Sequence, residues 1–496
     1  MIIPAYIARN ARKYPQQEAV IDGSLRITWS QLNEHVEQFA EHLACDHHIQ
    51  VGERVCLVLP NSYTFIVAHF AVQRIGAIVA PINVKLTADE LHYIFSDAET
   101  KLIISCDLTK QQAELAAQQL ELPLLIINDM PTYAASHSQG RSFHQLSDSA
   151  LKTPATLLYT SGTTGRPKGV LFDHQAILFV GMMFATEMQY TPASRLLSLM
   201  PLTHSAPLNL TLVGGSIVGS THVIAPTFTP DLLLQLVQQE RTTHFFGAPV
   251  AYLLTAQHPA IQKADLSSMT HWIYGGGPMA ADHAKLVQSA FNSDQFYCVY
   301  GLTEAGPTGS FLAPQDHAEK AGSVGRRAAL FTEMRVVNDA GVIAAVDEPG
   351  EIQIRGEGMM RGYWRNEDAT AATLTDDGWI KTGDIGVRDA DGFFWIKDRL
   401  KDLIIVGGVN VYPREVEDVL ASHPAILEAA VIGVPHDQWG ESVKAFVVLK
   451  EPLTEEALRD YVATRLADYK RPRSYEFRES LPHNANGKVL KHELRG

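Results

Sequence analysis

Residues 159–169 read Tyr-Thr-Ser-Gly-Thr-Thr-Gly-Arg-Pro-Lys-Gly and form the strongest chemical signal in the chain. The three glycines let the backbone approach a ligand closely, while the serine and the threonines supply hydroxyl donors. Arg166 and Lys168 add positive charge, and successive backbone N–H groups in such a loop can form an anion-binding nest. The stretch therefore predicts a loop that binds phosphate groups.

This loop does not have the spacing of a P-loop ATPase. That motif requires a glycine, four residues and then Gly-Lys-Ser/Thr. Counting from Gly162 reaches Pro167, and counting from Gly165 reaches Val170, so both fail. A plain polar turn between strands is the remaining structural interpretation, and the concentration of glycine, hydroxyl and basic residues in one run disfavours it.

On both sides of the loop, helical and strand patterns alternate along the chain. Leu32, Val36, Phe39 and Leu43 recur at helical spacing, and residues 55–59 form a compact apolar run that ends in a turn. The alternation predicts parallel α/β layers. Further strands are expected at 77–81, 102–105, 124–127, 243–246 and 271–274, and further helices at 65–76, 232–240 and from Pro278 to about Ala290.

After about residue 320 the pattern changes to short strands between Asp- and Gly-rich turns, at 339–341, 376–378 and 389–392. This predicts an antiparallel β subdomain at about 320–398, within a large N-terminal domain of residues 1–398. The charged segment that follows marks the main boundary, and residues 403–496 are long enough for a small α+β domain.

The bulk composition excludes several classes of protein. A chain of 496 residues is too long for one ordinary core, and its net charge of −14 argues against a nucleic-acid-binding protein. No stretch of about 18 apolar residues and no signal peptide is evident, so we expect a cytoplasmic protein without a transmembrane segment. No C-x-x-C pair occurs, and reduced, mostly buried thiols are expected at Cys45, Cys56, Cys106 and Cys298.

The loop at 159–169 resembles the phosphate loop of the adenylate-forming superfamily, which includes acyl-CoA synthetases, 4-coumarate–CoA ligases, peptide-synthetase adenylation domains and firefly luciferase. The resemblance spans essentially the whole chain, in the family's order, and is closest to the acyl-CoA synthetase or fatty-acid–CoA ligase branch. One departure is Thr203, where the family commonly carries an aromatic residue. The other matching motifs lie at 200–209, 275–280, 300–307, 379–384, 398–413 and 486–489.

The resemblance implies an enzyme that binds ATP and Mg²⁺. Tyr300 would offer a flat face to adenine, Glu304 would hold Mg²⁺, and Asp384 would accept hydrogen bonds from the ribose hydroxyls. The implied catalytic residues are Lys488, Glu304, Thr163 and His204. The implied ATP-binding residues are Thr160, Ser161, Gly162, Thr163, Thr164, Gly165, Lys168, Gly276, Gly277, Tyr300, Gly301, Thr303, Asp384, Arg399 and Lys488.

The resemblance also implies an acyl pocket, a tunnel for coenzyme A and a hinge at residues 399–402, about which a mobile C-terminal domain rotates. The hinge residue would be Lys401, and the tunnel residues would be Gly407, Gly408, Gly440 and Lys470. The acyl-pocket residues would be His204, Ala206, Leu210, Gly276, Gly301, Pro307 and Thr308. Most are small or apolar, and none is a carboxylate that could receive an amino group, which favours a medium- or long-chain fatty acid and then an aryl acid.

The expected activity is that of an AMP-forming acyl-CoA synthetase, which makes an acyl-adenylate and then a thioester with coenzyme A. Three alternatives remain: an acyl carrier protein as the acceptor, a luciferase-like oxidoreductase, and a non-catalytic relative. Retention of Lys488, Glu304, Asp384 and Arg399 argues against the last. The sequence leaves open which acid is used, the pathway, whether the chain forms a homodimer, and control by lysine acetylation.

Overall fold

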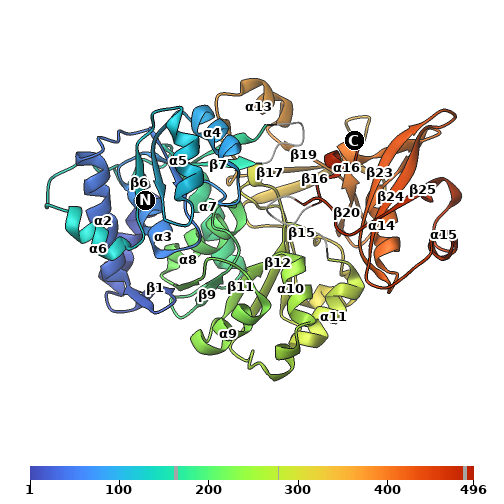
Figure 1. The fold of residues 1–496 in the computed structure, drawn as a ribbon, viewed down its shortest axis with the longest axis horizontal. Helices are drawn as coiled ribbons and strands as arrows, with labels where there is room; N and C mark the ends of the chain where they lie inside the picture. The colour runs from blue at the N-terminus through green and yellow to red at the C-terminus, as the bar shows by residue number, and fades with distance from the viewer. Residues whose placement is uncertain (161–165, 278, 484–488, 496) are drawn as a thin grey trace. The chain divides into compact units, whose positions relative to one another are not determined.

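The computed structural model describes residues 1–160, 166–277, 279–483 and 489–495. The chain divides into two compact units, Met1–Met334 with Ile354–Ile380, and Arg335–Gln353 with Lys381–Gly496. The first unit holds two large sheets with their helices, and the second is a smaller α+β unit (Figure 1). The predicted α/β class, with a β-rich segment and a small C-terminal α+β part, is confirmed.

One sheet of the first unit carries the predicted phosphate loop between two of its strands. Five neighbouring strands are parallel, and two antiparallel strands follow them at one edge. The parallel strands at its centre are apolar and buried on both faces, as parallel sheets require. The order is β18 (Gly362–Tyr363), β8 (Lys168–Asp173), β7 (Pro154–Thr160), β4 (Ile78–Pro81), β3 (Arg54–Val58), β5 (Thr100–Ser105) and β6 (Leu124–Ile126).

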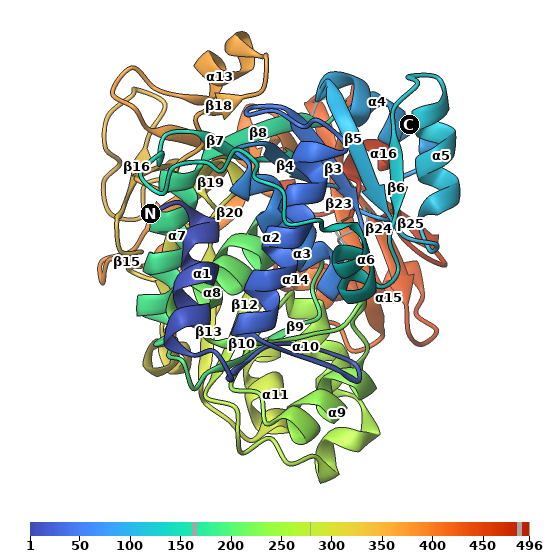
Figure 2. The same cartoon turned by 90° about the vertical axis from the view of Figure 1, so that its left-hand side faces the viewer.

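Four of the six helices in the first 140 residues, α2, α3, α4 and α6, begin at a side-chain cap. Thr28 forms a capping box with Gln31, and Thr87 forms one with Glu90, so both helix starts are encoded locally. Figure 2 shows the first three helices packed side by side. These helices are α1 (Ile3–Lys13), α2 (Trp29–Cys45), α3 (Tyr63–Arg74), α4 (Ala88–Asp97), α5 (Lys110–Gln118) and α6 (Met130–His137).

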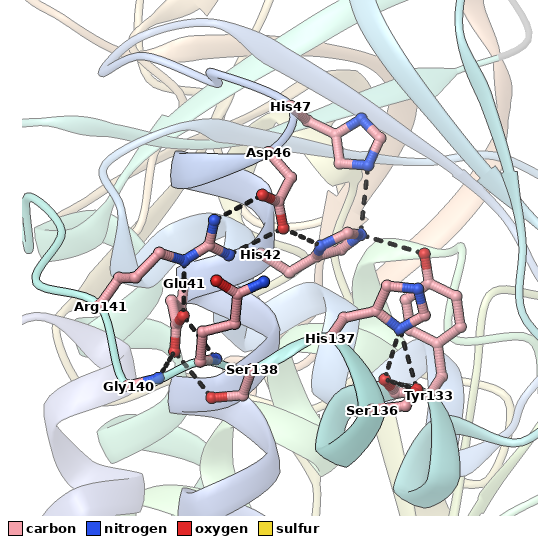
Figure 3. Close-up of polar contacts among 11 residues, drawn as sticks. Glu41, His42, Asp46, His47, Tyr133, Ser136, His137, Ser138, Gly140 and Arg141 are labelled. Atoms are coloured by element: carbon pink, nitrogen blue, oxygen red, sulfur yellow. Dashed lines mark hydrogen bonds and ion pairs between the residues drawn. The ribbon is translucent and has the colours of Figure 1, made fainter.

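A polar cluster joins α2 to α6 and to the segment that follows α6 (Figure 3). Arg141 donates to both carboxylate oxygens of Asp46, at 2.6 and 2.8 Å, and to Glu41 at 2.9 Å. His42 uses Nδ1 on Asp46 at 2.7 Å and Nε2 on the Tyr133 hydroxyl at 3.0 Å. Because the Arg141 guanidinium and His42 hold both of its oxygens, the pKa of the Asp46 carboxyl lies well below its usual range. The cluster therefore fixes the chain between α6 and β7.

The second sheet of the first unit is parallel in its middle and antiparallel at both ends. Its order is β15 (Arg327–Ala328), β14 (Ser310–Leu312), β13 (Phe296–Tyr300), β12 (His271–Gly275), β11 (His244–Gly247), β9 (Arg195–Ser198), β10 (Thr221–Ile224), β1 (Glu18–Asp22) and β2 (Leu25–Thr28). The remaining helices of this unit are α7 (His174–Glu187), α8 (Gly214–Val218), α9 (Pro230–Glu240), α10 (Pro249–Ala256), α11 (Ala281–Phe291), α12 (His317–Lys320) and α13 (Glu367–Thr373).

The helix predicted to start at Pro278 is the clearest error of the sequence-based assignment. The structure begins α11 at Ala281, after Ala280 in an extended conformation, so the prediction of Pro278 in the first turn was wrong. Pro278 itself lies outside the described residues. Met279 and Ala280, the described residues directly before the helix, belong to the connection that follows β12.

The second unit contains most of a four-stranded sheet and the whole of a five-stranded one. The first has the order β16 (Thr332–Val337), β17 (Gly350–Gly356), β19 (Ile380–Arg388) and β20 (Phe394–Arg399). The second has the order β22 (Val409–Val411), β21 (Ile404–Val406), β24 (Gly440–Leu449) and β23 (Ile426–His436), with β25 (Ser474–Arg478) on β24. Its helices are α14 (Pro413–Ala421), α15 (Glu455–Ala463) and α16 (Lys491–Leu494). Gly341 and Gly392 have φ of 77° and 87°, which confirms two of the predicted tight turns.

Two further expectations concern the thiols and the membrane. Cys56 and Cys298 are buried, while Cys45 and Cys106 are half-buried, so the prediction of mostly buried thiols holds for two of the four. Among the described residues, none of the helices combines the length and the apolar character needed to cross a lipid bilayer.

Candidate active site

The predicted phosphate loop connects β7 and β8, which form an antiparallel hairpin. Tyr159 pairs with Gly169 and Thr160 pairs with Lys168, so the two ends of the loop lie directly opposite each other. Lys168 is the first residue of β8, and the sheet therefore fixes the backbone from which its side chain extends. The predicted residues Ser161, Gly162, Thr163, Thr164 and Gly165 lie outside the described residues.

Helix α4 braces both ends of this loop. The Tyr159 hydroxyl donates to Asp97 Oδ2 at 2.6 Å, and the Tyr93 hydroxyl donates to the Pro167 carbonyl at 3.1 Å. Burial, reinforced by Asp97, raises the pKa of Tyr159 far above its usual value, so this phenol remains a hydrogen-bond donor. The Arg166 guanidinium lies 5.1 Å from the centre of the Tyr93 ring. The sequence analysis found none of these α4 contacts, because they depend on how distant segments pack.

Two adjacent parallel strands bring the predicted adenine-binding segments to one edge of the second sheet. β12 pairs with β13 so that Gly275 lies opposite Val299. The chain continues from β12 into Gly276 and Gly277, and β13 ends in Tyr300, directly before Gly301. Ligands of open α/β sheets bind at the carboxyl ends of the strands, which is where these residues are gathered.

The glycines at this edge serve different purposes. A Cβ on Gly275 would lie 2.6 Å from the Val299 carbonyl oxygen, and one on Gly301 would lie 2.4 Å from the Pro307 carbonyl oxygen, so packing requires both glycines. Gly276 has a φ of +76°, which a side chain would strain. A Cβ on Gly277 would meet nothing closer than Pro249 at 3.9 Å, so that position is open.

Glu304, the predicted magnesium ligand, lies in the short 3₁₀ helix Thr303–Ala305 directly after this edge. The Tyr363 hydroxyl donates to Glu304 Oε1 at 2.7 Å, and the Lys168 ammonium lies 4.0 Å from the centre of the Tyr363 ring. The structure thus brings together two predicted residues, Glu304 and Lys168, through a tyrosine that the sequence analysis missed. No signal in the local sequence marks Tyr363, because its role depends on the pairing of β18 with β8.

The predicted acyl-pocket residues fall into two groups. Ala206 and Leu210 lie on the π-helix Ala206–Val213, an element that occurs frequently at functional sites. Leu210 is buried in the same apolar cluster as Phe246 of β11 and Val299 of β13. His204 lies just before this helix, where the Asn83 side-chain amide donates to its Nε2 at 3.5 Å.

The second group, Pro307 and Thr308, packs against the backbone of Gly301. Pro307 and Thr308 are buried, and their backbone atoms are those that a Cβ on Gly301 would meet first. The Thr308 hydroxyl donates to the Ala305 carbonyl at 3.0 Å, so it stabilises the turn after Glu304. The prediction assigns Thr308 to the acyl pocket, and its contact shows a structural function in this turn.

The predicted ribose residues of the second unit lie opposite each other on neighbouring strands. Asp384 of β19 pairs with Arg399 of β20, and their side chains form an ion pair of 2.6 Å. The Asp384 carboxylate is buried, while the Arg399 guanidinium is partly exposed and also donates to the Thr382 carbonyl at 3.2 Å. The arrangement leaves the guanidinium accessible and its partner carboxylate fixed in position.

The predicted tunnel glycines gather at one end of the five-stranded sheet. Gly407 and Gly408 form the turn between β21 and β22, with φ of 58° and 84°. Gly440 pairs with Val406, and the Gly407 N–H donates to the Trp439 carbonyl at 2.9 Å. The Trp439 indole stacks on His436 with ring centres 4.4 Å apart. The sequence analysis missed this aromatic pair beside the predicted tunnel, in which Trp439 is exposed.

The structure describes two of the three lysines that were predicted to function in the C-terminal part of the chain. Lys470 donates to both oxygens of Glu415, at 2.6 and 2.8 Å. Lys401, the predicted hinge residue, lies in the 3₁₀ helix Leu400–Asp402. Lys488, the predicted catalytic lysine, lies outside the described residues; the next residue, Val489, forms a β-bridge with His483.

Known proteins resemble this chain over nearly its whole length. The family model described as AMP-binding enzyme matches residues 7–364, and the model of the AMP-binding enzyme C-terminal domain matches residues 415–488. A feruloyl-CoA synthase of Amycolatopsis is 36% identical over 489 residues, which cover 98% of this chain and 97% of that protein. The long-chain-fatty-acid–CoA ligase FadD13 of Mycobacterium tuberculosis is 33% identical over 501 residues, which cover 99% of this chain and 97% of that protein.

Solved structures of similar proteins have the same fold over nearly the whole of this chain. The ATP-bound structure of MatB from Rhodopseudomonas palustris has a TM-score of 0.90 at 28% identity, and covers 100% of this chain and 98% of that one. A fatty acyl CoA synthetase from Mycobacterium tuberculosis has a TM-score of 0.79 at 32% identity, and covers 100% and 97%. The resemblance expected from the motifs is confirmed: the chain belongs to the AMP-binding enzymes, in the acyl-CoA synthetase branch of the adenylate-forming superfamily.

Proposed function

We propose that this acid–thiol ligase activates a monocarboxylic acid with Mg·ATP and transfers the acyl group to coenzyme A. The observation that carries the proposal is the shared edge of β12 and β13, where Gly276, Gly277, Tyr300 and Gly301 converge. An open glycine backbone opposite a tyrosine suits a flat adenine ring with an acyl group beside it. Glu304 follows on the same chain segment, close to where phosphate groups would lie.

In the first half-reaction, a carboxylate oxygen of the acid attacks the α-phosphorus of ATP. The bond to the bridging oxygen breaks, pyrophosphate leaves, and a mixed anhydride, the acyl-adenylate, remains. This chemistry depends mainly on positioning and on stabilisation of developing negative charge. In the proposal Lys168 and the backbone of 160–165 hold the β- and γ-phosphates, Asp384 and Arg399 hold the ribose, and Lys488 contacts the carboxylate and the α-phosphate.

The residues present suit a magnesium ion bound mainly by phosphate oxygens. Within the described residues no three His, Cys, Asp or Glu side chains converge as a ligand set, whereas Glu304 offers one carboxylate. Mg²⁺ is commonly bound in this way, through one or two carboxylates together with substrate phosphates and water. When bound, the ion would neutralise charge on the phosphates during the displacement.

In the second half-reaction, a thiolate attacks the acyl carbonyl carbon, and AMP leaves with the electron pair of the broken anhydride bond. Gly407, Gly408 and Gly440 are the residues we assign to the passage of the thiol arm. Their side-chain-free backbone allows close approach, and the exposed Trp439 beside them offers an aromatic surface. A carrier-protein phosphopantetheine would present the same thiol arm, and assays with each acceptor distinguish the two.

The predicted pocket residue Ala206 packs against the apolar cluster that contains Leu210, Phe246 and Val299, which supports an apolar acid as the substrate. We favour a medium- or long-chain fatty acid and, next, an aryl acid. The relatives support both choices, because their names include a long-chain-fatty-acid–CoA ligase and a feruloyl-CoA synthase.

The test is pyrophosphate release with a panel of acids, each measured with and without coenzyme A. Release that requires a particular acid and rises strongly with coenzyme A is the expected result. Release that coenzyme A does not stimulate would identify a carrier protein as the acceptor. A preference for amino acids or dicarboxylates would overturn the substrate assignment, and no release with any acid would overturn the proposed reaction.

A further inference from the structure

Tyr363 reaches the phosphate loop through the pairing of two strands that are far apart in the sequence. Strand β18 pairs antiparallel with β8, so that Tyr363 lies opposite Val170. The next residue continues the contact, because the Trp364 N–H donates to the Gly169 carbonyl at 2.7 Å. Side chains two residues apart share a face of a strand, so Lys168 is the diagonal neighbour of Tyr363 on that face.

The Tyr363 side chain contacts one predicted residue with its hydroxyl and another with its ring. Its hydroxyl donates to Glu304 Oε1 at 2.7 Å, and Lys168 Nζ lies 4.0 Å from its ring centre. Among the described residues, no carboxylate forms an ion pair with Lys168, whose ammonium lies over the Tyr363 ring. The Tyr363 side chain therefore contacts a cation with its ring and an anion with its hydroxyl.

The surrounding backbone holds Tyr363 firmly. The side chain is 8% exposed, and its own N–H donates to the Thr370 hydroxyl at 2.9 Å. Three residues earlier, the Met360 N–H donates to the Glu304 carbonyl at 2.8 Å, so one segment contacts both the backbone and the side chain of Glu304. Tyr363 therefore has a fixed backbone and a buried side chain at the point where its hydroxyl contacts Glu304.

We propose, on the basis of the function proposed above, that Tyr363 is a positioning residue that sets Glu304 and Lys168 for the magnesium-bound triphosphate. The phenol occupies Oε1 and leaves Oε2 of Glu304 for a cation. The ring holds the Lys168 ammonium in a cation–π contact and separates it from Glu304. The two side chains therefore do not neutralise each other, and both charges stay available for the ligand. Groups that orient a metal ligand in this manner commonly change metal affinity about 10-fold or more when they are removed.

Two substitutions separate the two contacts. Tyr363→Phe deletes the hydroxyl and keeps the ring, so ATP affinity without Mg²⁺ should stay as in the wild type. The gain in ATP affinity that Mg²⁺ produces should shrink, with the half-saturating Mg²⁺ concentration raised about 10-fold. Tyr363→Leu also deletes the ring, so it should weaken ATP binding both with and without Mg²⁺.

Isothermal titration calorimetry of ATP into the full-length protein, across a series of MgCl₂ concentrations, measures these effects without any turnover. Steady-state kinetics gives a second readout, a raised Mg²⁺ requirement of pyrophosphate release. Tyr133→Phe is the matched control, because it also removes one partly buried hydroxyl, which lies 3.0 Å from His42 Nε2 on α2. It should leave the Mg²⁺ dependence unchanged.

A double-mutant cycle with Glu304→Gln completes the test, because it asks whether Tyr363 acts through Glu304. Tyr363→Phe should have little further effect on Mg²⁺ dependence in the Glu304→Gln background. Additive effects, or an unchanged Mg²⁺ midpoint in a folded Tyr363→Phe protein, would overturn the inference. Failure of the wild type itself to bind ATP or to release pyrophosphate would instead overturn the proposed function, so the two failures are distinguishable.

Discussion

Arg399 Nε lies 2.6 Å from Asp384 Oδ1, across the antiparallel pair of strands β19 and β20. The register places the two residues directly opposite each other, so the ion pair is a consequence of the sheet. Asp384 is largely buried, and its own N–H donates to the Thr382 hydroxyl at 3.0 Å, which fixes its backbone. Asp384, the proposed acceptor for the ribose hydroxyls, is thus held by Arg399 across the strand pair and by its backbone hydrogen bond to Thr382.

Asp384→Asn should weaken ATP binding about 10-fold or more, because a hydrogen bond to a charged acceptor contributes about 1.5–3 kcal/mol. An amide has only one acceptor oxygen, whereas the carboxylate can accept from both ribose hydroxyls. The measurement is the KM for ATP against the KM for 2′-deoxy-ATP in pyrophosphate release. The wild type should discriminate between the two nucleotides, and the variant should discriminate less; equal discrimination by both proteins would contradict the assignment of Asp384.

Lys488→Ala should slow formation of the acyl-adenylate about 10²- to 10³-fold, the cost of one lost group that stabilises charge in the transition state. Conversion of a supplied acyl-adenylate to the thioester should continue. In that step the thiolate attacks the acyl carbon, so no negative charge develops at an α-phosphorus under attack. Single-turnover assays of each half-reaction make the comparison, with replacement of Lys450, an exposed lysine of the same unit, by Ala as the control. Equal loss in both half-reactions would rule out the proposed role.

Much of this arrangement could be predicted from sequence, and the exceptions have a common physical cause. Local patterns predicted the strands around Leu57 and Ile103 because buried parallel strands are continuous apolar runs. Residues such as Glu304 and Asp384 could be proposed from the sequence because each of their motifs lies within a few neighbouring positions. Tyr363 and Trp439 were missed because only long-range strand pairing brings them to Glu304 and Gly407.

Substitutions of two glycines at the β12–β13 edge should have different effects on protein stability and on ATP binding. Gly301→Ala would force a Cβ to 2.4 Å from the Pro307 carbonyl oxygen, so it should destabilise the protein by about 1–3 kcal/mol. Gly277→Ala has open space around it and should leave stability almost unchanged, while reducing ATP affinity if adenine packs on that backbone. Chemical denaturation and calorimetry with ATP distinguish the two effects. A Gly301→Ala protein of unchanged stability would contradict the packing argument.

Buried neutral histidines should make the protein lose stability in mild acid. Burial lowers the pKa of one group of histidines far below the usual 6.5, to about 3 for His69, His174, His222 and His244 and to about 4 for His271. Below pH 6.5 the unfolded chain binds protons that the folded chain does not, so the free energy of unfolding falls as the pH falls from 6.5 towards 4. Each such histidine contributes up to about 1.4 kcal/mol per pH unit in that window.

His69 offers the sharpest test, because it is fully buried, stacks on Phe65 and has no hydrogen-bond partner for either ring nitrogen among the described residues. His69→Leu replaces an unpartnered imidazole with an apolar side chain, so it should shift the midpoint of acid unfolding to lower pH. Equilibrium urea denaturation at several pH values between 4 and 7.5 measures the change, with the exposed His492 replaced by Gln as the control. The difference in stability between His69→Leu and the wild type should grow as the pH falls below 6.5; a difference that stays constant across this range would show that His69 is not held neutral by burial.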